Sequence, residues 1–410
     1  MAPQVRSVMV LGSWIGGVVA LTVATGCGPN PDQGPQPMNA PQPTATVATA
    51  STSGTASMTT VPVPTATGTS APVAEPAPEP IPPPSPPPHV ARGVDTPADK
   101  ALVEGDTAFA KADYAGAEKA YLKAQRLAPK DPAPAVGLAR ARLGKGNVPE
   151  GFGSAPDDKV AKAAAADLAK AAKLDAAYGP VQTELAKALL VLGKAEEAVA
   201  AAKKGTELSP NDAEAHSALG VAMLATGDVA RALASFQKSV QLAGGDFGRQ
   251  LNLGTVLLAA GKPGDAAPVF EKALRISPGD ARAENGLGTA LLGLGDPVKA
   301  SPHLEKAVSA DPENASYKSN LGYAWSLRGD LAKAIDYYKQ ATQKNPKLVS
   351  AWINLGNAYG AQEKFTDACD AYVKVHAIDP ADPRLKDALI EIDDLAKKKG
   401  LTNGAGCKVK

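Results

Sequence analysis

The side chains most able to perform chemistry are few in this chain and far apart. Of the 410 residues, four are histidines and three are cysteines: His89, His216, His303, His376, Cys27, Cys369 and Cys407. A metal site or an activated nucleophile needs partner groups at defined spacings. The sequence contains no phosphate-binding glycine loop, no Gly-x-Ser-x-Gly turn and no His-Glu-x-x-His pair. We therefore expect no enzymatic activity, no metal and no cofactor.

Charge and cysteine content exclude further classes of protein. Lys and Arg number 43 against 42 Asp and Glu, so no basic surface for nucleic acid is expected. Three cysteines are too few for a disulfide-rich scaffold. Cys369 is expected in a helix core and Cys407 in the C-terminal tail. The sequence leaves open whether these two pair in an oxidising compartment.

Cys27 follows an apolar leader. Arg6 is the only charged residue before it, and residues 8–25 are uncharged. This pattern predicts the charged and hydrophobic regions of a secretory signal, although the length is also near the lower limit for a membrane-spanning helix. Small residues stand directly before Cys27, which resembles the lipobox of bacterial lipoproteins, with Ala24 where those proteins usually carry leucine.

The lipobox resemblance implies that residues 1–26 are a lipoprotein-type signal peptide and that Cys27 is lipidated. Two or more acyl chains are enough to hold a protein at a membrane. Gly28 stands where inner-membrane lipoproteins carry aspartate, so the resemblance implies the bacterial outer membrane, with the protein facing the periplasm. A cell-surface or secreted location is the alternative.

Residues 27–97 are expected to form a disordered tether. Nineteen of the 36 prolines fall between Gly28 and Pro97, among Thr, Ala, Ser, Val and Gln. Such a composition cannot bury enough apolar surface to offset the entropy lost on ordering. A segment of this length reaches about 45 Å as a flexible coil and about 220 Å as polyproline II. We interpret it as a spacer, with a ligand for a proline-recognising domain as the alternative.

A period of 34 residues governs the rest of the chain. Leu-Gly pairs recur at this step at Leu219-Gly220, Leu253-Gly254, Leu287-Gly288, Leu321-Gly322 and Leu355-Gly356. Glycines from Gly193 to Gly329 and alanines from Ala198 to Ala368 keep the same step. We expect the glycine series to end the first helix of each unit in a left-handed conformation.

The copy Trp352-x-x-Leu355-Gly356-x-x-Tyr359, followed by Ala368-x-x-x-Tyr372 and Pro380, resembles the tetratricopeptide repeat (TPR). The resemblance implies an all-α fold, a right-handed TPR superhelix (α-solenoid) of about eight helix-turn-helix repeats over residues 98–382. The units are 98–131, 132–178, 179–212, 213–246, 247–280, 281–314, 315–348 and 349–382.

Two segments depart from the repeat. The second unit carries an insertion near 147–159, which is expected to be a loop between its helices, either a tolerated surface loop or a functional one. After the last unit, Asp382 and Pro383 favour the start of a helix over 383–400. Its stripe of Leu385, Leu389, Ile392 and Leu395 predicts a helix that caps the solenoid, before a tail at 401–410.

In TPR proteins the fifth, sixth and ninth positions of the first helices line a concave groove, so the resemblance implies a peptide-binding surface. The side chains expected there are neutral, mostly amides and hydroxyls, which can pair with the backbone of an extended peptide. They include Asn252, Thr255, Asn285, Thr289, Asn320, Tyr323, Asn354 and Asn357. The fifth position is never lysine, which argues against a clamp for a chaperone tail. The alternative is that these asparagines bond only local backbone.

These observations favour a non-catalytic scaffold that binds a protein or peptide partner while a lipid anchor holds it to a membrane. The architecture resembles envelope lipoproteins such as the pilotins of type IV pilus secretins, so a role in assembling an envelope complex is one hypothesis. The alternatives are a substrate-recruiting arm for an enzyme acting in trans and a cell-wall or polysaccharide-binding protein. Few tryptophans are present to stack on sugars, which disfavours the last.

Overall fold

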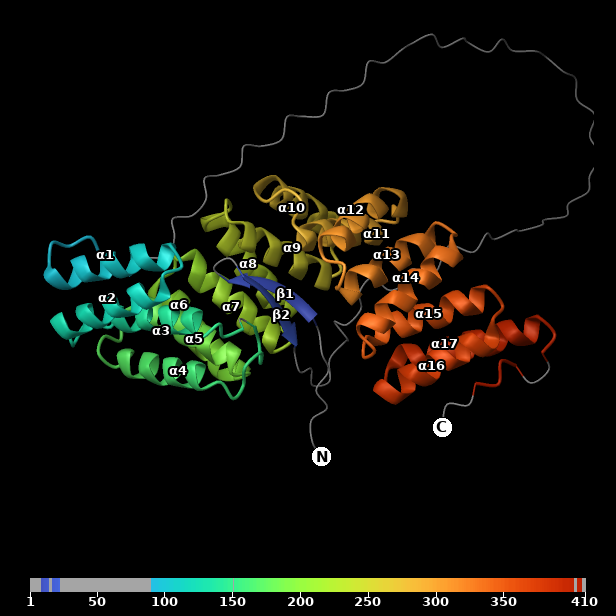
Figure 1. Cartoon of the computed structure of the whole chain (residues 1–410), viewed down its shortest axis with the longest axis horizontal. Coiled ribbons are helices and arrows are strands. Elements are labelled where there is room, and N and C mark those ends of the chain that lie inside the picture. The colour runs from blue at the N-terminus through green and yellow to red at the C-terminus, as the bar shows by residue number, and fades with distance from the viewer. Residues whose placement is uncertain (1–8, 15–16, 23–89, 150, 402–403, 408–410) are drawn as a thin grey trace, which may run out of the picture. The chain divides into compact units, whose positions relative to one another are not determined.

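The computed structural model describes residues 9–14, 17–22, 90–149, 151–401 and 404–407. Cys27 and the predicted tether up to residue 89 lie outside these residues. From residue 97 to 398 the described chain is a succession of antiparallel helix pairs (Figure 1). The expected all-α solenoid is therefore confirmed for the repeats.

Each repeat contributes a first and a second helix of similar length. The first helices are α1 (Pro97–Ala110), α3 (Ala133–Lys145), α5 (Gly179–Val191), α7 (Ala213–Ala225), α9 (Phe247–Ala259), α11 (Ala281–Gly293), α13 (Ala315–Leu327) and α15 (Val349–Ala361). The second helices are α2 (Tyr114–Leu127), α4 (Lys159–Ala171), α6 (Ala195–Leu208), α8 (Val229–Leu242), α10 (Pro263–Ile276), α12 (Pro297–Ala310), α14 (Leu331–Lys344) and α16 (Phe365–Ile378).

The turns between paired helices follow from two residue types. Gly227 has φ +80° and Gly329 has φ +83°, the left-handed conformation that glycine adopts without steric cost. Asp228 and Asp330 come next and cap the second helix, because each side chain accepts a hydrogen bond from a backbone N–H three residues later. A short Gly-Asp turn thus both ends one helix and starts the next.

Several repeats close on one large side chain of the second helix, such as Tyr121, Phe236, Phe270, Tyr338 and Tyr372. The ring of Phe270 lies against Gly254 of its own repeat and Gly286 of the next, where an added Cβ would come within 2.7 Å and 2.3 Å of the ring. Phe270 is 1% exposed. Tyr121 is held in the same way between Gly105 and Gly137. The glycines therefore provide space for the rings.

The helices form two rows. Every second helix packs against the first helix of its own repeat and against the first helix of the next. First helices also contact one another, α1 to α3 to α5 to α7 and α9 to α11 to α13 to α15. Residues at one position of successive first helices are therefore neighbours in space, which is the condition for a surface that spans repeats.

The apolar leader contains two short strands. β1 (Met9–Trp14) pairs antiparallel with β2 (Gly17–Thr22), with Met9 opposite Thr22. The sequence left open a signal peptide or a membrane-spanning helix here. Within the described residues, no helix has both the length and the apolar character needed to cross a bilayer.

The insertion in the second repeat is fixed to the third. It follows α3 and precedes α4, and the backbone N–H groups of Gly153 and Ala155 donate to the carbonyls of Leu190 and Val191 at the end of α5. The bond from Gly153 is 2.8 Å long. These contacts add to the hydrogen bonds at the end of α5, where the carbonyl of Leu190 also accepts from the N–H of Gly193. The insertion therefore acts as a cap for α5.

The C-terminal end is closed by a helix and a covalent bond. α17 (Pro383–Lys398) buries Leu385, Ala388 and Ile392 against the last repeat, while Leu389 is only partly buried. Cys369 of α16 and Cys407 of the tail form a disulfide, with their Cα atoms 4.9 Å apart. The structure thus pairs the two cysteines whose partnership the sequence left open.

Candidate functional site

The neutral residues expected to bind a partner lie on neighbouring first helices. We call them the neutral strip: Asn252 and Thr255 on α9, Asn285 and Thr289 on α11, Asn320 and Tyr323 on α13, and Asn354 and Asn357 on α15. Successive members of α9, α11, α13 and α15 contact one another. The strip therefore runs across four repeats.

The centre of the neutral strip is a hydrogen-bonded group between two repeats. The Nδ2 of Asn320 donates to Oδ1 of Asn285 at 2.9 Å and to Oγ1 of Thr289 at 3.4 Å. Thr289 in turn donates to the backbone carbonyl of Asn285. A side-chain amide has two donors and an acceptor. The Oδ1 of Asn320 and the Nδ2 of Asn285 have no hydrogen-bond partner among the described residues.

The two ends of the strip differ in exposure. Asn252 is 1% exposed, and the hydroxyl of Thr255 bonds the backbone of its own helix, so this end is structural. Asn354 is half-buried, and no described residue hydrogen-bonds its side chain. Asn357 is exposed and accepts from the Tyr372 hydroxyl at 2.7 Å. The accessible polar groups therefore concentrate on α11, α13 and α15.

Tyr323 adds an apolar surface to this end of the strip. It packs beside the cores of both neighbouring repeats and is only half-buried. Burial raises the pKa of its hydroxyl above the ordinary value, so the group stays protonated near neutral pH. Tyr323 can therefore donate a hydrogen bond while its ring contacts a ligand.

A second group, not expected from the sequence, crosses the first helices of the N-terminal half. We call it the charged ladder: Arg140 on α3, Glu184 and Lys187 on α5, Glu214 on α7 and Arg249 on α9. Arg140 lies 2.8 Å from Glu184, and Lys187 contacts both Glu184 and Glu214. Glu214 also pairs with Arg249 at 3.0 Å. Opposite charges therefore alternate along the charged ladder, with both signs present on α5.

Three of the five members of the charged ladder are almost completely buried, and Glu214 and Arg249 are partly buried. The side chains of Arg140, Glu184 and Lys187 are 8%, 4% and 6% exposed. Burial opposes the charged form of Glu184, but Arg140 and Lys187 outweigh it and lower the pKa of the carboxyl. The same balance lowers the pKa of Glu214 to about 2, with Lys187 and then Arg249 as the main opposing charges. Each charged group already has its counter-charge within the protein. We therefore assign the charged ladder a structural role, in which its ion pairs hold adjacent repeats together.

The sequence did contain a signal for the ladder. Arg140, Glu184 and Lys187 occupy the sixth and ninth positions of their repeats, the same positions that define the neutral strip. Residues of opposite charge at the groove positions of adjacent repeats, such as Arg140 and Glu184, indicate ion pairs between those repeats.

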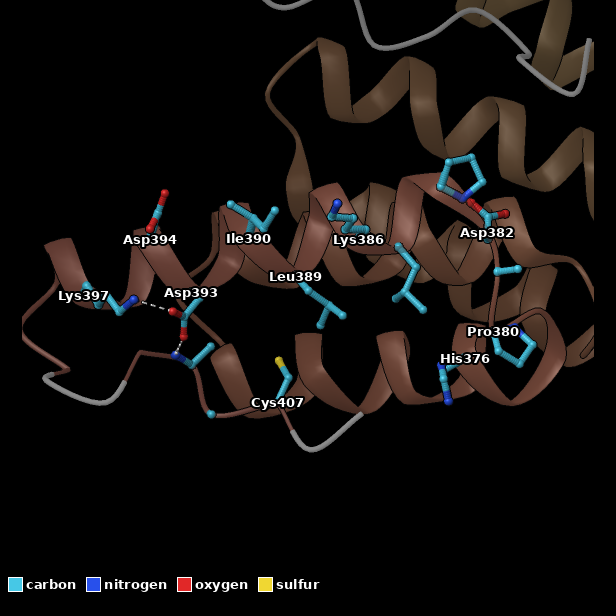
Figure 2. Close-up of a pocket in the computed structure, with 15 residues that line it drawn as sticks. His376, Pro380, Asp382, Lys386, Leu389, Ile390, Asp393, Asp394, Lys397 and Cys407 are labelled. Atoms are coloured by element: carbon cyan, nitrogen blue, oxygen red, sulfur yellow. Dashed lines mark hydrogen bonds and ion pairs between the residues drawn. The ribbon is translucent and has the colours of Figure 1, made fainter. Parts of the chain in front are cut away.

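A shallow cavity of about 850 Å³ lies against α17 and the tail (Figure 2). Leu385 and Leu389 line it, with Cys407 at its edge. Asp393 accepts from the backbone N–H of Ala405 at 3.0 Å and pairs with Lys397. The hydrogen bond from Lys397 lowers the pKa of Asp393, so its carboxylate stays ionised at neutral pH. Among the described residues, no cluster of His, Cys, Asp and Glu could hold a metal ion.

One similar solved structure supports the fold, and two others are similar over shorter stretches. The APC/C hetero-tetramer Cut9–Hcn1 matches 73% of this chain at 16% identity with a TM-score of 0.53, and the match covers 56% of that chain. YrrB, a TPR protein with an unusual peptide-binding site, matches 46% of this chain and 98% of its own at 25% identity, with a TM-score of 0.36. PilF of Pseudomonas aeruginosa matches 53% of this chain and 98% of its own at 19% identity, with a TM-score of 0.44.

The two last TM-scores are too low to support any inference about this chain. A search of curated proteins found no relative of this sequence. Models of the tetratricopeptide repeat match residues 183–247, 257–321 and 349–382, and a TPR repeat model matches residues 327–363. The segments 183–247, 257–321 and 327–382 of this chain are therefore tetratricopeptide repeats.

Proposed function

We propose that this protein is a non-catalytic scaffold that binds an extended peptide or protein segment on the neutral strip. One observation carries the proposal. Asn285, Asn320 and Asn354 present amide groups on three adjacent first helices, and each retains donors or acceptors that no described residue uses. An extended backbone offers alternating donors and acceptors, which such a row of amides can match.

The chemistry of the strip indicates how the partner is recognised. Its members carry no charge, and the charged residues of the neighbouring ladder are already paired and buried. Affinity should therefore depend on hydrogen bonds and on contact with the Tyr323 ring, and it should change little with salt. A partner recognised mainly by its charge would bind more weakly as the ionic strength rises.

The test is the double variant Asn320→Ala with Asn354→Ala. Crosslinking in cells followed by mass spectrometry of the captured proteins identifies partners of the unaltered protein. We expect the double variant to lose them by about tenfold or more, since two positions contribute about 1 kcal/mol each. Gln343→Ala, which removes an exposed amide from the second helix α14, is the matched control. Capture that is unchanged in the double variant would refute the proposal.

We also propose that Cys27 carries a lipid anchor, that residues 27–89 form a tether and that the scaffold serves assembly of an envelope complex at the outer membrane. The lipobox-like leader and the proline-rich composition support this proposal. Metabolic labelling with a palmitate analogue tests the anchor. We expect label on the unaltered protein and none on Cys27→Ala, and equal labelling of the two would exclude the anchor.

A further inference from the structure

The first repeat carries an extended segment of the chain on its surface. Residues 90–94, which we call the strap, belong to the region expected to be disordered tether, yet they contact α1 closely. The backbone N–H of Val90 donates to both carboxylate oxygens of Asp106 at 3.0 Å and 2.9 Å. The N–H groups of Arg92 and Val94 donate to Asp99 at 2.7 Å and 2.9 Å.

The strap runs antiparallel to α1, because its first residue meets the later carboxylate and its last residues meet the earlier one. Gly93 has φ +73°, and this left-handed residue lets the amides on both sides of it reach one carboxylate. Asp99 is 4% exposed, and Asp106 also accepts from the Tyr121 hydroxyl at 2.8 Å. The carboxylates of Asp99 and Asp106 are therefore positioned by contacts within the first repeat.

Two side chains of the strap complete its contacts. Val90 is 2% exposed and joins the core of the first repeats. Arg92 reaches Asp131 before α3, at 2.7 Å, and its guanidinium lies 4.8 Å from the centre of the Tyr178 ring before α5. The strap thus contacts the first two repeats through backbone amides, one buried apolar side chain and one arginine.

Asp106 occupies the ninth position of its repeat, and this position contributes to the neutral strip in later repeats. We propose that α1, together with Asp131 before α3 and Tyr178 before α5, forms a second peptide-binding site, which takes an extended segment with the pattern Val-x-Arg-Gly. In this chain the strap fills that site and blocks it against a partner. A partner protein with a segment of the same chemistry is the ligand that displaces the strap. This site is separate from the neutral strip, and the inference does not rest on the proposed function.

The physical basis of the block is competition within one chain. A segment joined directly to α1 has an effective concentration in the millimolar range. A free peptide of the same sequence therefore binds only to the fraction of molecules whose strap is open, which weakens its apparent affinity by that fraction. Opening the strap by mutation should restore the intrinsic affinity.

The experiment uses the full chain and a fluorescent peptide with the sequence of residues 88–96, acetylated and amidated at its ends. Val90→Asn replaces the buried isopropyl group of valine with a polar amide. Burying that amide without a hydrogen-bond partner is unfavourable, so the strap should leave the site. Val94→Asn is the matched control, because the Val94 side chain is 52% exposed. Fluorescence anisotropy should show the peptide binding at least about tenfold more tightly to the Val90→Asn protein than to the unaltered and Val94→Asn proteins. A peptide with Ala in place of the arginine should bind none of them.

Amide hydrogen exchange of the strap gives an independent measure in the unaltered protein. The amides of Val90, Arg92 and Val94 should exchange faster than those of α1 and α3, which shows that the strap opens while the repeats stay folded. Exchange of the strap only together with those helices would refute the proposal. Failure of the peptide to bind a Val90→Asn protein with a released strap would also refute it and would leave the strap as a structural cap only.

Discussion

The first helices of the N-terminal half and those of the C-terminal half use the same repeat positions in opposite ways. Glu184 and Asn320 are four steps of 34 residues apart, and so are Lys187 and Tyr323. Glu184 and Lys187 are almost completely buried and bond one another, Arg140 and Glu214. Asn320 and Tyr323 are half-buried, and their polar groups are only partly used.

This contrast shows that the position of a residue in the repeat determines where its side chain lies on the helix. It does not determine whether that side chain pairs with a neighbour or stays accessible. In the second and third repeats the place is filled by charged side chains that pair with one another and with Glu214 of the fourth. In the C-terminal half neutral side chains occupy it, so hydrogen-bonding groups remain accessible. The N-terminal half, whose charged groups already have partners, also carries the strap, which contacts α1. Regions with the same fold thus differ in how many polar groups remain accessible.

The largest effect is expected from Glu184→Ala. The change removes the carboxylate shared by Arg140 and Lys187 and leaves buried positive charge, which costs about 3–5 kcal/mol of unfolding free energy. Urea denaturation followed by circular dichroism measures the loss. Trp325 and Trp352 lie on α13 and α15, so in a Trp14→Phe background their fluorescence reports the C-terminal half and should change little.

Glu104→Ala is the control for that change. Glu104 pairs with Lys123, and both side chains are more than half exposed, at 57% and 52%, so its loss should cost under about 1 kcal/mol. If Glu184→Ala costs no more than Glu104→Ala, the charged ladder does not stabilise the N-terminal half.

The next effect is the response to acid. The pKa of Glu214 is lowered from 4.5 to about 2 in the folded protein. A lowered pKa contributes stability above about pH 4.5, and this contribution is lost as the pH falls toward 2. The full loss is about 3 kcal/mol, at about 1.4 kcal/mol per pH unit. Thermal unfolding at pH 6 and pH 3 should therefore show the N-terminal half melting first at low pH, with circular dichroism falling before tryptophan fluorescence changes.

Glu214→Gln is the matched variant for the acid response. It keeps the shape of the side chain and removes the titrating group, so unfolding should depend less on pH between 4.5 and 2, from a lower starting stability. An unchanged pH dependence would show that other carboxylates cause the acid response, and the assignment to Glu214 would fail.

The smallest effect is expected from Asn320→Ala, at the position equivalent to Glu184. It removes two hydrogen bonds between α11 and α13 from a half-buried site and leaves no buried charge, so the cost should be about 0.5–1.5 kcal/mol. Urea denaturation followed by tryptophan fluorescence measures it. A loss as large as that of Glu184→Ala would show that the neutral strip has the same structural role as the ladder, and the comparison between the halves would fail.

Much of the architecture could be predicted because the repeat depends on residue types that act on the nearby backbone and side chains. Gly227 and Gly329 adopt the left-handed conformation that ends a helix, and Phe270 fills the space that Gly254 leaves. The strap could not be predicted, because Val90 and Arg92 adjoin a proline-rich segment and find their partners through α1 and the start of α3. The insertion at 147–159 was placed correctly between helices, but its bonds to α5 join residues far apart in sequence.

The helical repeat, its period and the neutral character of the strip can be predicted from the sequence, since they depend on short-range spacing and on side-chain type. Which of these side chains already have partners depends on how the helices pack. Arg140, Glu184 and Lys187 become a buried network because stacking brings successive first helices together. The pairing of Cys369 with Cys407 and the docking of the strap likewise depend on contacts that only the packed chain creates. Spacing along the chain fixes where a side chain points on its own helix, whereas burial and charge pairing depend on what the neighbouring helix places opposite it.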